Sequence, residues 1–193
     1  MDIALMLLFA YLLGSVPIGF LMGFISGVDV RQEGSGNVGA TNVARVMGKG
    51  RGVLTLLGDA GKGYIPVFLS LQLELDFWVS AVTAFVAFLG HLYPVFLKFK
   101  GGKGVATALG VFLALTPMGA GILVLVFFLV VIFSRMVSLG SLVASVLAPI
   151  IFWYFSGSLY LVGLSFLIAL FTIARHRDNI QRMISGVEPR FNF

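Results

Sequence analysis

The chain has 193 residues, of which 59% are hydrophobic and 11% charged, with a formal net charge of +5. These values are typical of a polytopic membrane protein and argue against a globular domain with a soluble core. The chain contains no cysteine, which excludes a disulfide framework and a thiolate metal site or nucleophile.

Apolar segments recur along the chain, several of them near the twenty or so residues that a bilayer-spanning helix needs. Glycine, proline, serine or charged residues bound each of them. The segments lie at residues 3–25, 53–72, 77–97, 104–115, 118–133, 137–155 and 157–174. They predict an all-α polytopic membrane bundle with about seven transmembrane helices, forming a single domain over residues 1–193. The segment 104–115 is short, so a re-entrant element and a six-span bundle stay open.

Basic residues predict the orientation of the bundle. With seven spans, every Lys and Arg that flanks a span lies on one side, and only Lys62 falls inside a span. That side is expected to be cytoplasmic, with the amino terminus outside and the carboxyl terminus inside. Six spans would divide the basic clusters between two faces and fit less well. The first segment lacks a basic leading region and is too long for a signal-peptide core, so we expect it to be retained.

Three polar patches on the predicted cytoplasmic face hold the chemically informative residues, and the first covers residues 31–51. Its three glycines can adopt positive φ and expose N–H groups to an anion, namely Gly34, Gly36 and Gly39. Four polar side chains add donors, namely Ser35, Asn37, Thr41 and Asn42. Arg45 follows Thr41 by four residues, so on a helix its guanidinium lies on the same face. The alternative is a flexible loop with a helix cap, but the density of glycine and polar residues favours phosphate binding.

The second patch covers residues 91–107 and leads into the fourth apolar segment. A glycine loop that opens a helix points N–H donors at an anion, and Lys103 adds a charge between Gly102 and Gly104. The Walker pattern is not met, because Gly104 follows Lys103 and no strand precedes the loop, so we reject nucleotide binding. Lys98 and Lys100 are equally explained as a basic flank that reaches lipid headgroups.

His91 lies near the predicted cytoplasmic end of the third span, where an ionisable residue is unusual. It can be a packing group, a donor to substrate or a general base, and the sequence does not separate these roles. The only other histidine is His176, and no cysteine or nearby carboxylate pair accompanies either, so we expect no metal site.

The third patch covers residues 175–182 and directly follows the last apolar segment. If it stays helical, Arg175, Asn179 and Arg182 share one face, with His176 three residues before Asn179. The alternative is an ordinary basic flank after a final span.

Asp59 and Lys62 are three residues apart within the second predicted span. On a helix they neutralise each other, so we expect an ion pair near the cytoplasmic end, with a polar wall of the site as the alternative. Small residues in the later spans suit close helix packing, among them Gly110, Gly119, Gly121 and Gly140.

The three patches carry the tracts S-G-N-V-G-A-T-N-x-x-R, G-H-x-x-P-x-F followed by F-K-G-G-K-G-V-A-T, and R-H-x-x-N-I-x-R. In order and spacing these closely resemble the bacterial acyl-phosphate:glycerol-3-phosphate acyltransferases. The resemblance covers nearly the whole chain and implies transfer of a fatty acyl group from acyl phosphate to the 1-hydroxyl of sn-glycerol 3-phosphate. The product is lysophosphatidic acid, for phospholipid synthesis. The resemblance also implies that neither acyl-CoA, a metal nor a cofactor takes part.

The resemblance assigns residues by motif position. The implied catalytic residues are Ser35, Arg45, His91 and Lys103. The implied substrate-binding residues are Gly36, Asn37, Thr41, Asn42, Gly101, Gly102, Gly104, Thr107, His176 and Asn179. The proton of the attacking hydroxyl is expected to pass to the substrate's own phosphate, because the sequence offers no buried carboxylate at the site. The implied location is the bacterial cytoplasmic membrane with the site facing the cytoplasm, and the implied partners are the two substrates and membrane lipids, without nucleic acid.

Two other classes of function compete with this interpretation. A transporter of small anions or phospholipid headgroups also needs basic glycine loops, but it needs polar residues across the whole membrane as well. Here the outer halves of the predicted spans are almost purely apolar. A structural subunit that binds anionic lipid through basic loops would not explain the interleaved Gly, Asn and Thr.

Overall fold

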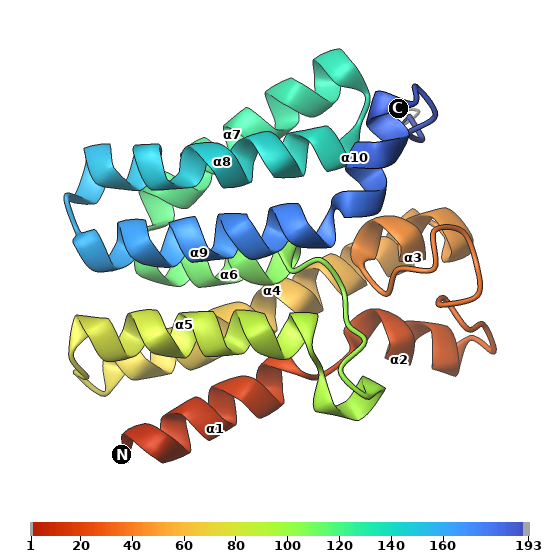
Figure 1. Ribbon diagram of the computed structural model, residues 1–193. Helices are drawn as coiled ribbons and strands as arrows, with labels where there is room; N and C mark the ends of the chain where they lie inside the picture. Colours follow the sequence, from red (N-terminus) through yellow and green to blue (C-terminus); the bar gives the residue numbers. More distant parts are fainter. Residues whose placement is uncertain (1, 191–193) are drawn as a thin grey trace. The chain divides into compact units, whose positions relative to one another are not determined.

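A computed structural model describes residues 2–190 of the chain (Figure 1). The chain divides into two compact units, with the boundary in the sequence between Leu115 and Thr116. All regular elements within residues 2–190 are helices. The predicted all-α class is therefore confirmed. Each unit is described by itself below.

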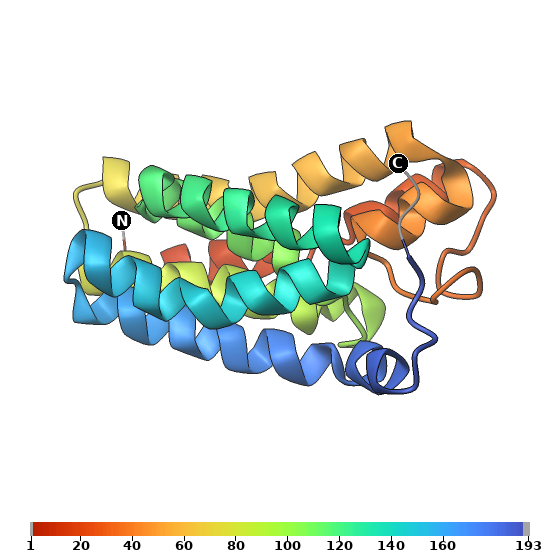
Figure 2. The same ribbon diagram turned by 90° about the horizontal axis from the view of Figure 1, so that it is seen from above.

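The first unit consists of six α-helices and one short 3₁₀ helix. They are α1 (Ile3–Gly14), α2 (Ile18–Ile25), α3 (Ala40–Met47), α4 (Lys49–Gln72), α5 (Phe77–Leu92), η1 (Val95–Leu97) and α6 (Val105–Leu115). The long helix α4 packs against α5 and α6, and α1 packs along α5 (Figure 1). The stretch between α2 and α3 contains no helix and forms the first polar loop (Figure 2).

The first apolar segment is two helices, α1 and α2, bent by 41° at a short break. Pro17 lies in that break, where it cannot donate a backbone hydrogen bond, and it disfavours helical geometry at Val16. The first predicted apolar segment, residues 3–25, is therefore interrupted at this point. In this break the Val16 carbonyl accepts a hydrogen bond from the side chain of Lys62 on α4.

Small residues allow α4 and α6 to approach closely. A Cβ added at Gly110 would collide with the backbone of Ala60, and one added at Gly63 would collide with the backbone of Thr107. Close approach of this kind is how membrane helices gain packing energy without a hydrophobic driving force between them. The packing role predicted for Gly110 is confirmed.

The second unit is built from α7 (Pro117–Ser134), α8 (Val137–Ser156), α9 (Leu159–Arg175) and α10 (Arg177–Ile184). Two-residue connections join α7 to α8 and α8 to α9, so successive helices pack as antiparallel neighbours (Figure 2). Gly119 and Gly140 pack closely against neighbouring side chains, as predicted, whereas Gly121 has no neighbour within 4 Å of an added Cβ.

Three helical segments among the described residues are long and apolar enough to cross a membrane, namely Phe77–Leu97, Pro117–Ser134 and Val137–Ser156. Two bent pairs, α1 with α2 and α9 with α10, raise this number to five when each pair is taken as one span. Each of the seven predicted apolar segments contains a helix, but the number of crossings and the orientation stay predictions.

Candidate active site

The buried side chain of Asn42 organises the first polar loop. Its Oδ1 accepts a hydrogen bond from the Ser35 N–H at 2.8 Å, and its Nδ2 donates to the carbonyls of Val30 and Glu33 at 3.0 and 3.1 Å. With the Arg45 guanidinium also 3.3 Å from Oδ1, the amide uses both of its donor hydrogens and both acceptor positions. Asn42 is only 2% exposed. Its geometry is that of a residue that holds the loop, rather than one that is open to a ligand.

Asn42 thereby brings together two residues that the sequence assigns to the site. The Ser35 backbone and the Arg45 guanidinium meet at the same Asn42 oxygen, and Ser35, Thr41 and Arg45 are all exposed. Arg45 lies one turn after Thr41 on α3, as predicted. The result is a set of donors on the solvent side of a fixed loop.

The glycines of this loop have different roles. Gly34 and Gly36 adopt φ values of +60° and +68°, which L-residues rarely adopt, as the sequence predicted. Gly39 has φ of −79° and is the N-cap of α3, with its N–H bonded to Asn37 Oδ1 at 2.8 Å. The positive φ considered for Gly39 is therefore corrected. The first N–H groups of α3 have no acceptor within the helix, so this end of α3 favours an anion.

An ion pair braces the start of the loop. Arg31 contacts both carboxylate oxygens of Asp29, at 2.9 and 2.7 Å, and lies 4.7 Å from the centroid of the Phe20 ring. The hydrogen bond from the Arg31 side chain lowers the pKa of Asp29 to about 2, with a second contribution from the Arg31 backbone. Asp29 is therefore ionised at neutral pH and holds the chain where it leaves α2.

The second polar loop, residues 98–104 between η1 and α6, lies against the end of α5. The N–H of Gly101 donates to the Leu92 carbonyl at 3.1 Å, and the N–H of Gly102 donates to the His91 carbonyl at 3.2 Å. A Cβ at Gly102 would collide with His91 Nε2. These two glycines thus permit close packing on His91, and the N–H groups that were expected to face an anion are used within the fold.

Gly104 ends this loop and starts α6. It has φ of +83°, an added Cβ would meet the Phe88 ring, and its carbonyl accepts the Ala108 N–H at 2.7 Å. Lys103 lies just before this helix start, as predicted. Thr107 is fully buried and packs against Gly63 of α4, so its predicted contact with substrate has no support in this geometry.

The two loops share one small hydrophobic cluster. Val38 of the first loop and Leu97 of η1 are both buried, and they pack with Val30 and Val43. Two segments about sixty residues apart in the sequence are thereby held side by side, as the prediction of one site with two anion-binding loops requires.

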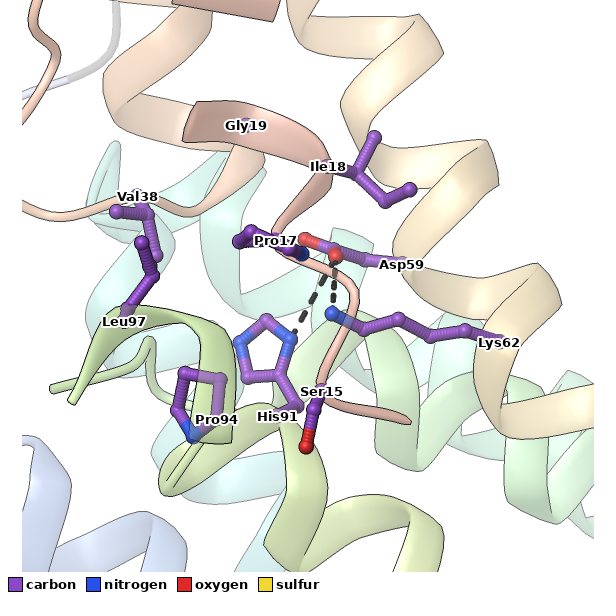
Figure 3. A pocket seen from close by; sticks show the side chains of 10 residues that line it. All are labelled: Ser15, Pro17, Ile18, Gly19, Val38, Asp59, Lys62, His91, Pro94 and Leu97. Atoms are coloured by element: carbon purple, nitrogen blue, oxygen red, sulfur yellow. Dashed lines mark ion pairs between the residues drawn. The ribbon is translucent and has the colours of Figure 1, made fainter. Parts of the chain in front are cut away.

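Val38 and Leu97 also line a pocket, and three ionisable side chains lie in its wall (Figure 3). Lys62 Nζ lies 2.9 Å from Asp59 Oδ1, which confirms the predicted ion pair, and His91 Nδ1 lies 3.5 Å from the same oxygen. Asp59, Lys62 and His91 are 2%, 4% and 5% exposed. The expectation that no buried carboxylate lies at the site was wrong.

The third patch belongs to the second unit. The helix does not continue through it, because α9 and α10 are bent by 60° at His176, which corrects the continuous stripe considered for residues 175–182. His176 is buried, and its Nδ1 donates to the Thr172 carbonyl at 2.8 Å.

Glu188 is the partner of two residues in this patch. Asn179 Nδ2 donates to Oε1 at 2.6 Å, and Arg182 Nε donates to Oε2 at 2.8 Å. Burial acts to raise the pKa of Glu188, but the nearby Ser138 hydroxyl and these two donors outweigh it and lower the pKa. The chain turns back after α10 to bring Glu188 to this patch, and no rule of residue spacing predicts that return.

Residues 2–190 contain no group of three or more metal-ligating side chains placed to hold an ion. Two basic side chains lie at the polar loops, Arg45 at the first and Lys103 at the second.

Comparisons with known proteins decide the family. The sequence profile of the family "Glycerol-3-phosphate acyltransferase" matches residues 4–186. The chain belongs to this family. It is 52% identical over 190 residues to the glycerol-3-phosphate acyltransferase of Syntrophotalea carbinolica, covering 97% of this chain and 96% of that one. It is 48% identical over 183 residues to that of Geobacter sulfurreducens, covering 94% of each.

Solved structures of the family have the same fold. A crystal structure of PlsY, an integral membrane glycerol 3-phosphate acyltransferase, in its glycerol 3-phosphate form matches with a TM-score of 0.96 at 42% identity, covering all of this chain and 96% of that one. Its lysophosphatidic acid form matches with a TM-score of 0.93 at 41% identity, with the same coverage. This acyltransferase family member is therefore an all-helical integral membrane protein, as the sequence predicted.

Proposed function

We propose that this acyltransferase moves a fatty acyl group from acyl phosphate to the 1-hydroxyl of sn-glycerol 3-phosphate in phospholipid synthesis. Acylation of glycerol 3-phosphate follows from the family, and the relatives solved with glycerol 3-phosphate and with lysophosphatidic acid support this substrate and product. The observation that carries the proposal is the first loop, where Asn42 fixes Ser35 and Arg45 beside the start of α3.

The proposed reaction needs little from the protein beyond binding and orientation. The hydroxyl oxygen attacks the acyl carbonyl carbon, the new ester C–O bond forms, and the bond from that carbon to the phosphate oxygen breaks. Inorganic phosphate leaves with the electron pair of that bond. Because acyl phosphate is already activated, we propose that no metal or cofactor is needed and that Arg45 and Lys103 stabilise the negative charge.

We further propose the residue roles that the motifs imply. Ser35, Arg45, His91 and Lys103 act at the reacting groups. The substrates are held by Gly36, Asn37, Thr41, Asn42, Gly101, Gly102, Gly104, Thr107, His176 and Asn179. Within this set the geometry favours an indirect role for Asn42, Gly101, Gly102 and Thr107, which are bonded or buried within the fold.

The hydroxyl proton has two possible acceptors. The first is the phosphate of glycerol 3-phosphate itself, and the second is His91, whose ring faces Asp59. Loss of turnover in His91→Ala with unchanged substrate affinity, and loss of one limb of the pH profile, would favour the histidine.

The membrane arrangement is also part of the proposal. We propose one domain over residues 1–193 with seven spans in the bacterial cytoplasmic membrane, the amino terminus outside and the carboxyl terminus inside. The site then faces the cytoplasm. The one-sided distribution of Lys and Arg supports this arrangement.

The decisive assay mixes the purified protein, in a lipid environment, with radiolabelled glycerol 3-phosphate and either palmitoyl phosphate or palmitoyl-CoA. We expect labelled lysophosphatidic acid with palmitoyl phosphate alone, and the same yield after treatment with EDTA. Product with palmitoyl-CoA alone would overturn the proposal that acyl phosphate is the acyl donor. If folded protein that still binds glycerol 3-phosphate gives no product with either donor, the alternative of a transporter for small anions or phospholipid headgroups is favoured.

A further inference from the structure

A buried ion pair at the centre of the first unit connects to both polar loops. Asp59 and Lys62 lie on α4, and a single oxygen, Asp59 Oδ1, faces both Lys62 Nζ at 2.9 Å and His91 Nδ1 at 3.5 Å (Figure 3). Burying two charges is costly, and replacing such a pair by neutral groups is often harmless to stability. Stability alone therefore does not explain this pair.

Lys62 connects the pair to the first loop. Its Nζ donates to the Val16 carbonyl at 2.6 Å, in the break between α1 and α2. The same carbonyl accepts the Ile18 N–H at 3.1 Å, which makes it part of the start of α2. In α2, Gly19 lies so close to the Val38 carbonyl of the first loop that an added Cβ would collide with it. A shift of the start of α2 is thus transmitted to that loop.

Asp59 connects the pair to the second loop through His91. The ring of His91 presents Nδ1 to Asp59 and its Nε2 edge to Gly102, with no space for a Cβ between ring and glycine. The His91 carbonyl also accepts the Gly102 N–H at 3.2 Å. The orientation of this ring therefore sets where the second loop lies, one residue before Lys103.

We propose that Asp59 and Lys62 are positioning residues that fix the first and second polar loops relative to each other for acyl transfer. This proposal rests on the proposed function and adds to it two residues that lie outside the three motif tracts. Neither needs to contact a substrate. A displacement of about 1 Å between reacting groups can reduce the rate about 100-fold, which is the size of effect expected when the pair is removed.

The test uses variants of the full chain in lipid. Asp59→Asn alone leaves Lys62 buried without its partner, which can prevent folding. The decisive variant is therefore Asp59→Asn with Lys62→Met, which removes both charges at similar volume. We expect it to fold with a thermal midpoint near that of the wild type and to lose about 100-fold in kcat/KM for glycerol 3-phosphate. Lys62→Arg, which keeps the charge and the donors, should retain at least about a tenth of the wild-type value.

Ser70→Ala is the matched control. Ser70 lies further along α4 and is fully buried. Its hydroxyl donates to the Val67 carbonyl at 2.7 Å and lies 2.9 Å from the hydroxyl oxygen of Ser80 on α5. The substitution Ser70→Ala therefore removes a buried polar contact between α4 and α5, away from the two polar loops. We expect a lower thermal midpoint with unchanged kcat/KM.

Two results would overturn the proposal. One is a folded double variant with the kinetic constants of the wild type, and the other is Lys62→Arg as inactive as the double variant. If the wild type itself made no lysophosphatidic acid, the proposed function would fail separately. The positioning role of Asp59 and Lys62 would then be tested by the rise in thermal midpoint that added glycerol 3-phosphate causes. Loss of this rise in the double variant would support the positioning role. A rise equal to that of the wild type would overturn it.

Discussion

Asn42 offers the sharpest test of how the first loop is built. Asn42→Asp keeps the shape of the side chain and the acceptor that the Ser35 N–H and Arg45 use. It removes the two bonds that Nδ2 donates to the carbonyls of Val30 and Glu33. The Arg45 contact alone would be stronger with a carboxylate, so this variant separates the holding of the loop from the holding of the arginine.

The size of the effect follows from the two lost bonds. Each buried hydrogen bond contributes about 1 kcal/mol net, so the ordered loop loses about 2 kcal/mol relative to its disordered forms. That free energy corresponds to about 30-fold in kcat/KM when the ordered loop is needed for the reaction. Asn42→Ala removes all four bonds and should cost more, with about 4 kcal/mol as the upper limit.

The assay is the kcat/KM for glycerol 3-phosphate at saturating acyl phosphate, for both variants. The control is Thr55→Val, because Thr55 is fully buried but donates only to the Arg51 carbonyl of its own helix, at 2.9 Å. Full activity of Asn42→Asp would refute the reasoning, since the donors on Nδ2 would then not be needed to order the loop.

Three further predictions follow from the other contacts. Gly102→Ala should lower kcat/KM about 100-fold, because the added methyl displaces the His91 ring, whereas Gly61→Ala, with no neighbour within 4 Å, should keep full activity. Glu188→Gln should cost about 1–2 kcal/mol of unfolding free energy at pH 7, measured by thermal unfolding. The pKa of Glu188 is lowered from 4.5, so the difference should vanish as the pH falls below that lowered value. Lys103→Ala should raise the KM for both substrates or abolish turnover, and near-normal kinetics would exclude its loop from the site.

Helix positions were largely predictable from the sequence, because apolar periodicity and length report directly on burial in lipid. The break at Pro17 was not predicted, although proline and the restricted residue before it are the ordinary cause of such breaks. The bend at His176 has no comparable signal, since no proline or glycine lies at residues 175–177.

Asn42 shows why residue roles were harder to predict than positions. An amide that binds a ligand and an amide that holds its own loop carry the same donors and acceptor, and they differ only in burial. Glycine loops are ambiguous in the same way. The spacing predicted a polar segment, but only the contacts assign Asn42 to the inside of the loop and Ser35 to its surface.

The contact between Asp59 and His91 was within reach of the sequence. Each lies 16 residues from Leu75, in the turn between α4 and α5. In an antiparallel helix pair, residues equally far from the turn lie at the same height. The spacing alone pairs Asp59 with Lys62, three residues away, and nothing in it indicates that one carboxylate oxygen faces both Lys62 and His91.

The two polar loops each place a helix start beside a cation, but they are built differently. In the first, Gly34 and Gly36 supply the backbone turns, Gly39 begins α3, and Arg45 lies one turn inside the helix. In the second, the glycine N–H groups bond to α5, Gly104 begins α6, and Lys103 stands just before it. What the loops share is a helix start with a cation beside it, since both the unpaired first N–H groups and the helix dipole favour an anion there. Two such ends suit the two phosphorylated substrates of the proposed reaction, and glycine serves mainly to bring each helix end into place.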